Sequence, residues 1–123
     1  MTKVLIVEDD SILLKIYQKK FQVEGFEVET AEDGLEGLTK IKSLKPDLVV
    51  MDIMLPGLNG LEAMAKAKAD PQTSAIKFLV LTNLSTTDDA EAAIKKGASG
   101  FLVKSEITPT LVVDKAKQIL KSS

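Results

Sequence analysis

Five short apolar runs alternate along this chain with segments in which apolar residues recur every three or four positions. The runs predict β-strands at residues 4–7, 26–30, 47–51, 76–81 and 100–103. Because they are continuously apolar, they are typical of a parallel sheet that is covered on both faces. Strands that alternate with helices through right-handed crossovers predict an α/β fold, a doubly wound, three-layer (βα)5 sandwich.

The segments between the runs predict five helices. Their expected bounds are 11–24, 34 to a stop at 46, 60 to a break at 70–71, 86 or 87 to 96, and 108–121. Asp10 or Ser11 can cap the first helix, and Asn59 can cap the third. Spacing at three and four residues predicts the inward-facing side chains. They are Leu13, Leu14, Ile16, Tyr17, Phe21, Leu35, Leu38, Ile41, Leu61, Met64, Ala65, Lys68, Val112, Ala116, Ile119 and Leu120.

Carboxylates follow two of the predicted strands. Glu8, Asp9 and Asp10 come directly after residues 4–7, and Asp52 comes directly after residues 47–51. The carboxyl ends of parallel strands share one edge of the sheet, and ligands of open α/β sheets bind at that edge. The pattern predicts a cation site in which one carboxylate can also be a nucleophile. Asp10 is better explained as the cap of the following helix.

Composition narrows the chemistry. The 123 residues fit one domain, and 45% of them are hydrophobic, enough for a core. The chain has no Cys and no His, which excludes disulfides, thiolate nucleophiles, His-based triads and the usual zinc sites. A bound cation is therefore expected to be a hard one held by oxygen, with Mg²⁺ first. A net charge of −2 does not favour nucleic acid, and the absence of a run of about 18 apolar residues argues against a membrane span. We expect a cytoplasmic protein.

Polar motifs stand at the carboxyl ends of four predicted strands. They are Val7-Glu8-Asp9-Asp10, Asp52-Ile53-Met54-Leu55-Pro56-Gly57-Leu58-Asn59-Gly60, Leu81-Thr82 and Gly97-Ala98-Ser99-Gly100-Phe101-Leu102-Val103-Lys104. In this order and spacing they resemble the receiver domain of two-component response regulators, of the chemotaxis-regulator type, over almost the whole chain. The resemblance implies a single receiver domain over residues 1–123. It also supports a flavodoxin-like sheet with strand order 2-1-3-4-5.

The resemblance implies a role for each matching residue. Asp52 matches the phosphoacceptor, Thr82 the hydroxyl that binds the phosphoryl oxygen, and Lys104 the cation that pairs with the phosphoryl group. The Mg²⁺ ligands are expected to be Asp9, Asp52, the backbone carbonyl of Met54 and, through water, Glu8. Phe101, with Thr82, matches the switch.

Two departures from the family pattern carry expectations of their own. Ser105 follows Lys104 where the family usually has proline, often with a cis bond. The cost of a cis bond before another residue, about 2.5–4 kcal/mol, favours a trans Lys104–Ser105 bond, but the sequence leaves the isomer open. Asn83 follows Thr82, and neither Met54 nor Leu84 can orient an attacking water. Slow self-dephosphorylation is the expected consequence.

These features predict a phosphoaccepting switch rather than a stand-alone enzyme. The partner is expected to be a sensor histidine kinase or a histidine phosphotransfer protein, with output to a protein target through residues 87–121. A monomer or a phosphorylation-dependent dimer is expected. A pseudo-receiver that binds without phosphorylation is the alternative. Aspartate-nucleophile phosphatases need Asp-x-Asp after the first strand, and flavodoxins need a phosphate loop there, so both enzyme classes fit poorly.

Overall fold

The computed structural model describes residues 2–82 and 87–121. Its strands are β1 (Lys3–Val7), β2 (Glu27–Ala31), β3 (Leu48–Asp52), β4 (Lys77–Thr82) and β5 (Gly100–Val103). Its helices are α1 (Ser11–Val23), α2 (Gly34–Leu44), α3 (Gly60–Ala69), α4 (Thr87–Lys95), the 3-10 turn η1 (Lys104–Glu106) and α5 (Pro109–Lys121). Within these residues no helix is long and apolar enough to cross a membrane. Asn83, Leu84 and Thr86 lie outside the described residues.

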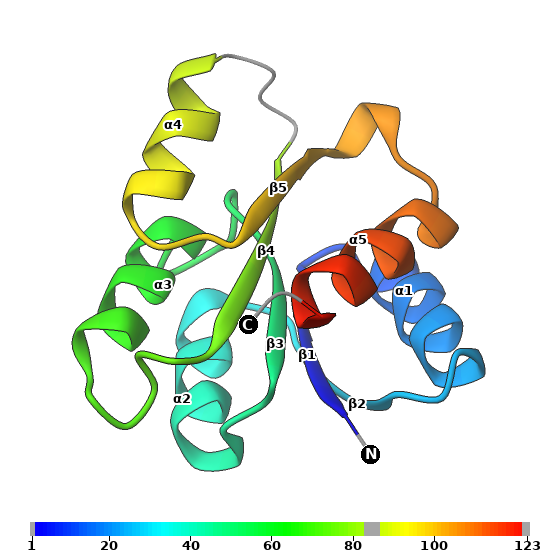
Figure 1. Cartoon of the computed structure of the whole chain (residues 1–123), viewed down its shortest axis with the longest axis horizontal. Helices are drawn as coiled ribbons and strands as arrows, with labels where there is room; N and C mark the ends of the chain where they lie inside the picture. Colours follow the sequence, from blue (N-terminus) through cyan, green and yellow to red (C-terminus); the bar gives the residue numbers. More distant parts are fainter. Residues whose placement is uncertain (1, 83–86, 122–123) are drawn as a thin grey trace.

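One sheet contains all five strands in the order β2-β1-β3-β4-β5, and every pair is parallel. The predicted fold class and strand order are confirmed. Helices α1 and α5 cover one face, and α2, α3 and α4 lie on the other (Figure 1). The register sets Asp52 opposite Leu81 and Thr82 opposite Val103, so the carboxyl ends of β3, β4 and β5 are level.

Each strand supplies side chains to two separate cores. On β3, Leu48 and Val50 pack in the core beneath α1 and α5, whereas Val49 and Met51 pack in the core beneath α2 and α3. Successive side chains of a strand point to opposite faces, so a strand covered on both sides must be apolar at every position. The uninterrupted apolar runs of the sequence have this origin.

Side-chain caps fix where three helices begin. Asp10 Oδ1 accepts hydrogen bonds from the backbone N–H groups of Ile12 and Leu13, which confirms it as the cap of α1. Asn59 Oδ1 accepts from Glu62 N and caps α3 as predicted. Asp33 does the same for α2 through Glu36 N. Each cap directly follows a strand or its loop and turns the chain back over the sheet.

The prediction of inward-facing side chains is wrong at two positions. Leu35 is 61% exposed and Ile16 is 43% exposed. Helix α2 meets the sheet through Gly37, where a Cβ would lie 3.0 Å from Val7 Cγ2, and Leu35 is two residues, about 200°, around the helix from that contact. Ile16 lies one residue, about 100°, around α1 from the buried Tyr17. The prediction also missed buried side chains at Ala63, Ala67 and Val113.

Candidate functional site

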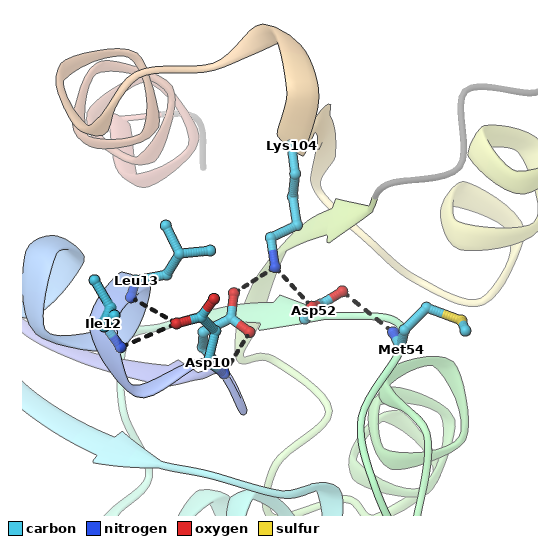
Figure 2. A network of polar contacts seen from close by, with 7 residues as sticks. Asp10, Ile12, Leu13, Asp52, Met54 and Lys104 are labelled. Atoms are coloured by element: carbon cyan, nitrogen blue, oxygen red, sulfur yellow. Dashed lines mark hydrogen bonds and ion pairs between the residues drawn. The ribbon is translucent and has the colours of Figure 1, made fainter.

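Three strand ends bring Glu8, Asp52 and Lys104 to one edge and one face of the sheet. Each lies two positions after a residue of the core beneath α1 and α5, namely Ile6, Val50 and Leu102. Since side chains alternate along a strand, all three project on that same side. Figure 2 shows the Lys104 side chain descending from the end of β5 toward Asp52 at the end of β3.

Lys104 bonds both carboxylates at once. Its Nζ lies 2.5 Å from Glu8 Oε1 and 2.8 Å from Asp52 Oδ2. The side chain of Lys104 is only 9% exposed, that of Glu8 2% and that of Asp52 5%. Backbone N–H groups hold the other carboxylate oxygens: Met54 N donates to Asp52 Oδ1, and Asp10 N donates to Glu8 Oε2, both at 3.2 Å. The expected proximity of Lys104 to Asp52 is therefore present, whereas its contact with Glu8 was not anticipated.

Burial and charge act in opposite directions on this group. Burial alone would lower the pKa of Lys104, but its hydrogen bonds to Asp52 and Glu8 outweigh burial and raise that pKa. Burial raises the pKa of the Glu8 carboxyl, and the hydrogen bonds from Lys104 and Asp10 N offset this only in part. The lysine is thus a firmly held cation that balances one of two neighbouring buried acids.

The side chains of Glu8, Asp9 and Asp52 form an acidic cluster. One carboxylate oxygen from each lies within 4.8 Å of the others, and Asp9 is the exposed member. A set of convergent oxygen ligands without nitrogen or sulfur suits a hard cation such as Mg²⁺. The cluster opens into a pocket of about 580 Å³ that Met54 also lines. The residues present fit the expected ion.

Thr82 and Phe101 belong to the opposite face of the sheet. Phe101 pairs with Val80 across β4 and β5, and both pack in the core beneath α2 and α3. Thr82 is two residues beyond Val80, so alternation gives it the same side, and it is fully buried. The two expected switch residues therefore share one side of the sheet, away from the Glu8–Lys104 pair. Phe101 is half-buried.

Tyr17 is a site residue that sequence reasoning treated only as core. It is 4% exposed and lines the same pocket as Asp52 and Lys104. Burial raises the pKa of its phenol; Lys104 opposes this rise, and the nearby carboxylates of Glu8, Asp52 and Asp10 add to it. An aromatic residue with a polar end on the inward face of the helix after the acids was the available signal. The Lys104–Ser105 bond, whose isomer the sequence left open, is trans, since the described residues contain no cis peptide.

Comparisons with known proteins agree with this geometry. The sequence model of the response regulator receiver domain matches residues 4–116. Response regulator ArlR of Staphylococcus aureus is 38% identical over 85% of this chain and 46% of its own length. DNA-binding response regulator MtrA of Mycolicibacterium paratuberculosis is 33% identical over 83% of this chain and 44% of its own length. The chain thus spans about half the length of these relatives.

A solved structure supports the same assignment. A response regulator from Chloroflexus aurantiacus superposes with a TM-score of 0.90 at 29% identity, covering 98% of each chain. The fold, the acidic strand ends and the match over most of the sequence have one explanation: the chain belongs to the response regulator receiver domain family.

Proposed function

We propose that this chain is a phosphoaccepting switch of a two-component or phosphorelay system, with Asp52 as the phosphoacceptor. The observation that carries the proposal is the position of Asp52, buried at the end of β3 with Lys104 Nζ at 2.8 Å and two further carboxylates beside it. A nucleophile, a cation and a metal-binding set within one pocket are what phosphoryl transfer needs.

The chain's own residues supply most of that chemistry. The N–H of Met54 orients the Asp52 carboxylate, one oxygen of which forms the new bond to phosphorus. The bond from phosphorus to the donor's imidazole nitrogen breaks, and its electron pair returns to the ring. Lys104 then stabilises the phosphoryl oxygens, and the hydroxyl of Thr82, at the neighbouring strand end, joins it by shifting toward them. Neighbouring carboxylates about 5 Å apart repel by roughly 3 kcal/mol at a dielectric of about 20, and a Mg²⁺ ion held by Asp9, Asp52 and the Met54 carbonyl supplies the opposing charge.

The output surface is proposed to be the face formed by α4, β5 and α5. Thr82 and Phe101 share the side of the sheet that α4 covers in Figure 1, so a shift of Thr82 toward a phosphoryl group changes the space available to Phe101. The proposed donor is a sensor histidine kinase or a histidine phosphotransfer protein, because the chain has no histidine of its own. The target is a protein, bound or released in the cytoplasm by the monomer or by a phosphorylation-dependent dimer.

Intact-mass measurement tests the proposal. The protein is incubated with a small acyl phosphate donor and Mg²⁺, and a single phosphoryl adduct is expected. The adduct should be absent in Asp52→Asn, which keeps the size of the side chain, and in wild-type protein treated with a chelator. A wild-type protein that takes up no phosphoryl group would favour the pseudo-receiver alternative, a module that binds its target without phosphorylation.

A further inference from the structure

An exposed apolar stripe runs along α1 and is bordered by positive charge. Ile12 is 71% exposed, Ile16 is 43% exposed and Val23 is 66% exposed. Spacings of four and seven residues bring these three side chains within about 40° of one another around the helix. Ile16 and Val23 also line a pocket of about 430 Å³. We call its lining the α1 patch: Lys15, Ile16, Lys19, Lys20, Val23 and Pro109.

The positive charge of the α1 patch is only partly balanced within the molecule. Helix α1 contains three lysines and no acidic residue. Lys20 Nζ lies 3.7 Å from Glu24 Oε2, but Lys15 and Lys19 form no ion pair within the described parts of the chain. A surface that covers this stripe must therefore offer apolar atoms together with carboxylates.

A second exposed patch, at the start of α2, has those properties. Leu35 is 61% exposed and lines a pocket of about 420 Å³. Residues 24–36 contain six acidic residues and no basic residue. We call the lining of this pocket the Leu35 patch: Asp33, Leu35, Glu36, Thr39, Pro56 and Gly57.

Hydrogen bonds at the start of α2 hold the acids of the Leu35 patch in place. Asp33 Oδ1 accepts from Glu36 N at 2.7 Å, and Glu36 Oε1 accepts from Glu32 N at 2.8 Å. This reciprocal arrangement fixes both carboxylates beside Leu35. Because they are already ordered, an ion pair with an incoming lysine costs less side-chain entropy than a pair between two mobile groups.

The two patches complement each other but cannot meet within one molecule. Each has an exposed aliphatic centre, and the charges around the two centres are opposite. Helix α1 lies on one face of the sheet and α2 on the other (Figure 1). Neither patch can pair with its own copy, since lysines would then face lysines and acids would face acids. The surface that fits each patch is the other patch on a second molecule.

We propose that this chain self-associates head to tail, with the Leu35 patch of one copy docked on the α1 patch of the next. Each added copy leaves one patch of each kind unpaired, so the contact can repeat into an open row or close into a ring. Salt screens the charges at the rim and weakens the association. The contact involves neither Asp52 nor the α4–β5–α5 face, so it goes beyond the proposed function and does not depend on it.

Sedimentation velocity of the unphosphorylated protein tests the proposal. At low salt, the average mass of the wild type should rise with concentration beyond that of a dimer, and added salt should lower it. Lys19→Glu and Leu35→Lys each spoil one patch at an exposed position. Each variant alone should stay at the monomer mass under conditions in which the average mass of the wild type at least doubles. Urea unfolding of each variant verifies that it is folded.

Mixing the two variants tests which surfaces pair. Lys19→Glu keeps an intact Leu35 patch, and Leu35→Lys keeps an intact α1 patch, so an equimolar mixture retains one complementary contact per pair. The mixture should therefore reach twice the monomer mass and no more. An isologous interface would not be restored by mixing in this way.

Helix α4 provides matched controls. Lys95→Glu and Ile94→Lys make the same two exchanges at exposed positions outside both patches, and both variants should assemble as the wild type does. A wild type that stays monomeric at every concentration would overturn the proposal. So would a mixture that stays monomeric, oligomers that persist in Lys19→Glu or Leu35→Lys, or controls that lose assembly as fully as those variants.

Discussion

At the scale of single residues, the charge balance of the site depends on Lys104. It is the ammonium that contacts the acidic cluster of Glu8, Asp9 and Asp52, and it bonds two of these acids inside the protein. Removing one partner of a buried pair leaves an uncompensated charge, which costs more than the pair itself contributes. Substitutions here are therefore expected to change stability and function together.

Lys104→Met is expected to remove a specific part of the protein's sensitivity to alkali. Hydrogen bonds to Asp52 and Glu8 raise the pKa of folded Lys104 above the unfolded value of 10.5. The folded state then keeps a proton that the unfolded state loses, so this contribution to stability is complete below pH 10.5 and declines as pH rises further. Each pH unit above 10.5 lowers the free energy of unfolding of wild type, relative to that of Lys104→Met, by up to about 1.4 kcal/mol. Urea unfolding of both proteins at a series of pH values measures this difference in unfolding free energy. A difference that stays constant with pH would contradict the raised pKa of Lys104.

A substitution at Met54 is expected to change the lifetime of the phosphorylated state. Its side chain is 61% exposed and lines the pocket beside Asp52, and it has no group that orients a water molecule. Met54→Asn places an amide there and should shorten the phosphorylated lifetime several-fold, because a positioned water attacks phosphorus more readily. Loss of the adduct mass with time measures this. Rapid loss from the wild type itself would show that the expected slow dephosphorylation is wrong.

At the scale of elements, the ends of the strands were the least accurately predicted feature. β2, β3 and β4 each end one residue later than expected, at Ala31, Asp52 and Thr82. The apolar pattern stops before Asp52 and Thr82, yet neighbouring strands extend the ladder, as in the hydrogen bond from Ile53 N to Leu81 O. The carboxylates that directly follow the apolar runs located the site edge from the sequence, but the Glu8–Lys104 contact depends on side-chain rotamers and on where β5 ends relative to β4. Periodicity does not determine either.

The close packing of α3 on the end of β3 can be tested with a glycine pair. A Cβ at Gly60 would lie 2.1 Å from the backbone oxygen of Asp52, whereas one at Gly57 would meet nothing within 4 Å. Gly60→Ala should therefore cost about 2–3 kcal/mol of stability through displaced backbone. Gly57→Ala should cost only about 1 kcal/mol of stability, because Gly57, at φ +75°, has a left-handed backbone conformation that Ala adopts less readily. Denaturant unfolding compares them, and equal losses would show that the helix adapts without strain.

At the scale of the whole molecule, the cation site proposed at the acidic cluster is expected to link cation binding to global stability. Its three carboxylates are brought together only by the folded sheet, because Glu8 and Asp9 follow β1 and Asp52 ends β3. The unfolded chain has no such site, so a cation that binds the folded state stabilises it by mass action. Repulsion among the same carboxylates destabilises the folded state when no cation is bound. The function of the cluster and the stability of the domain therefore depend on the same charges.

Asp9→Asn separates these two effects. Asp9 is the exposed member of the cluster, so its substitution disturbs little packing and removes one repelling charge. Without Mg²⁺ the variant should be more stable than wild type by about 1 kcal/mol. Saturating Mg²⁺ should raise the unfolding midpoint of wild type but barely that of the variant, because a proposed direct ligand is gone. Thermal unfolding of both proteins, with Mg²⁺ and with chelator, measures all four values. If Mg²⁺ stabilises the variant as much as it stabilises wild type, the cation binds elsewhere, and the metal site proposed at the carboxyl ends of β1 and β3 is wrong.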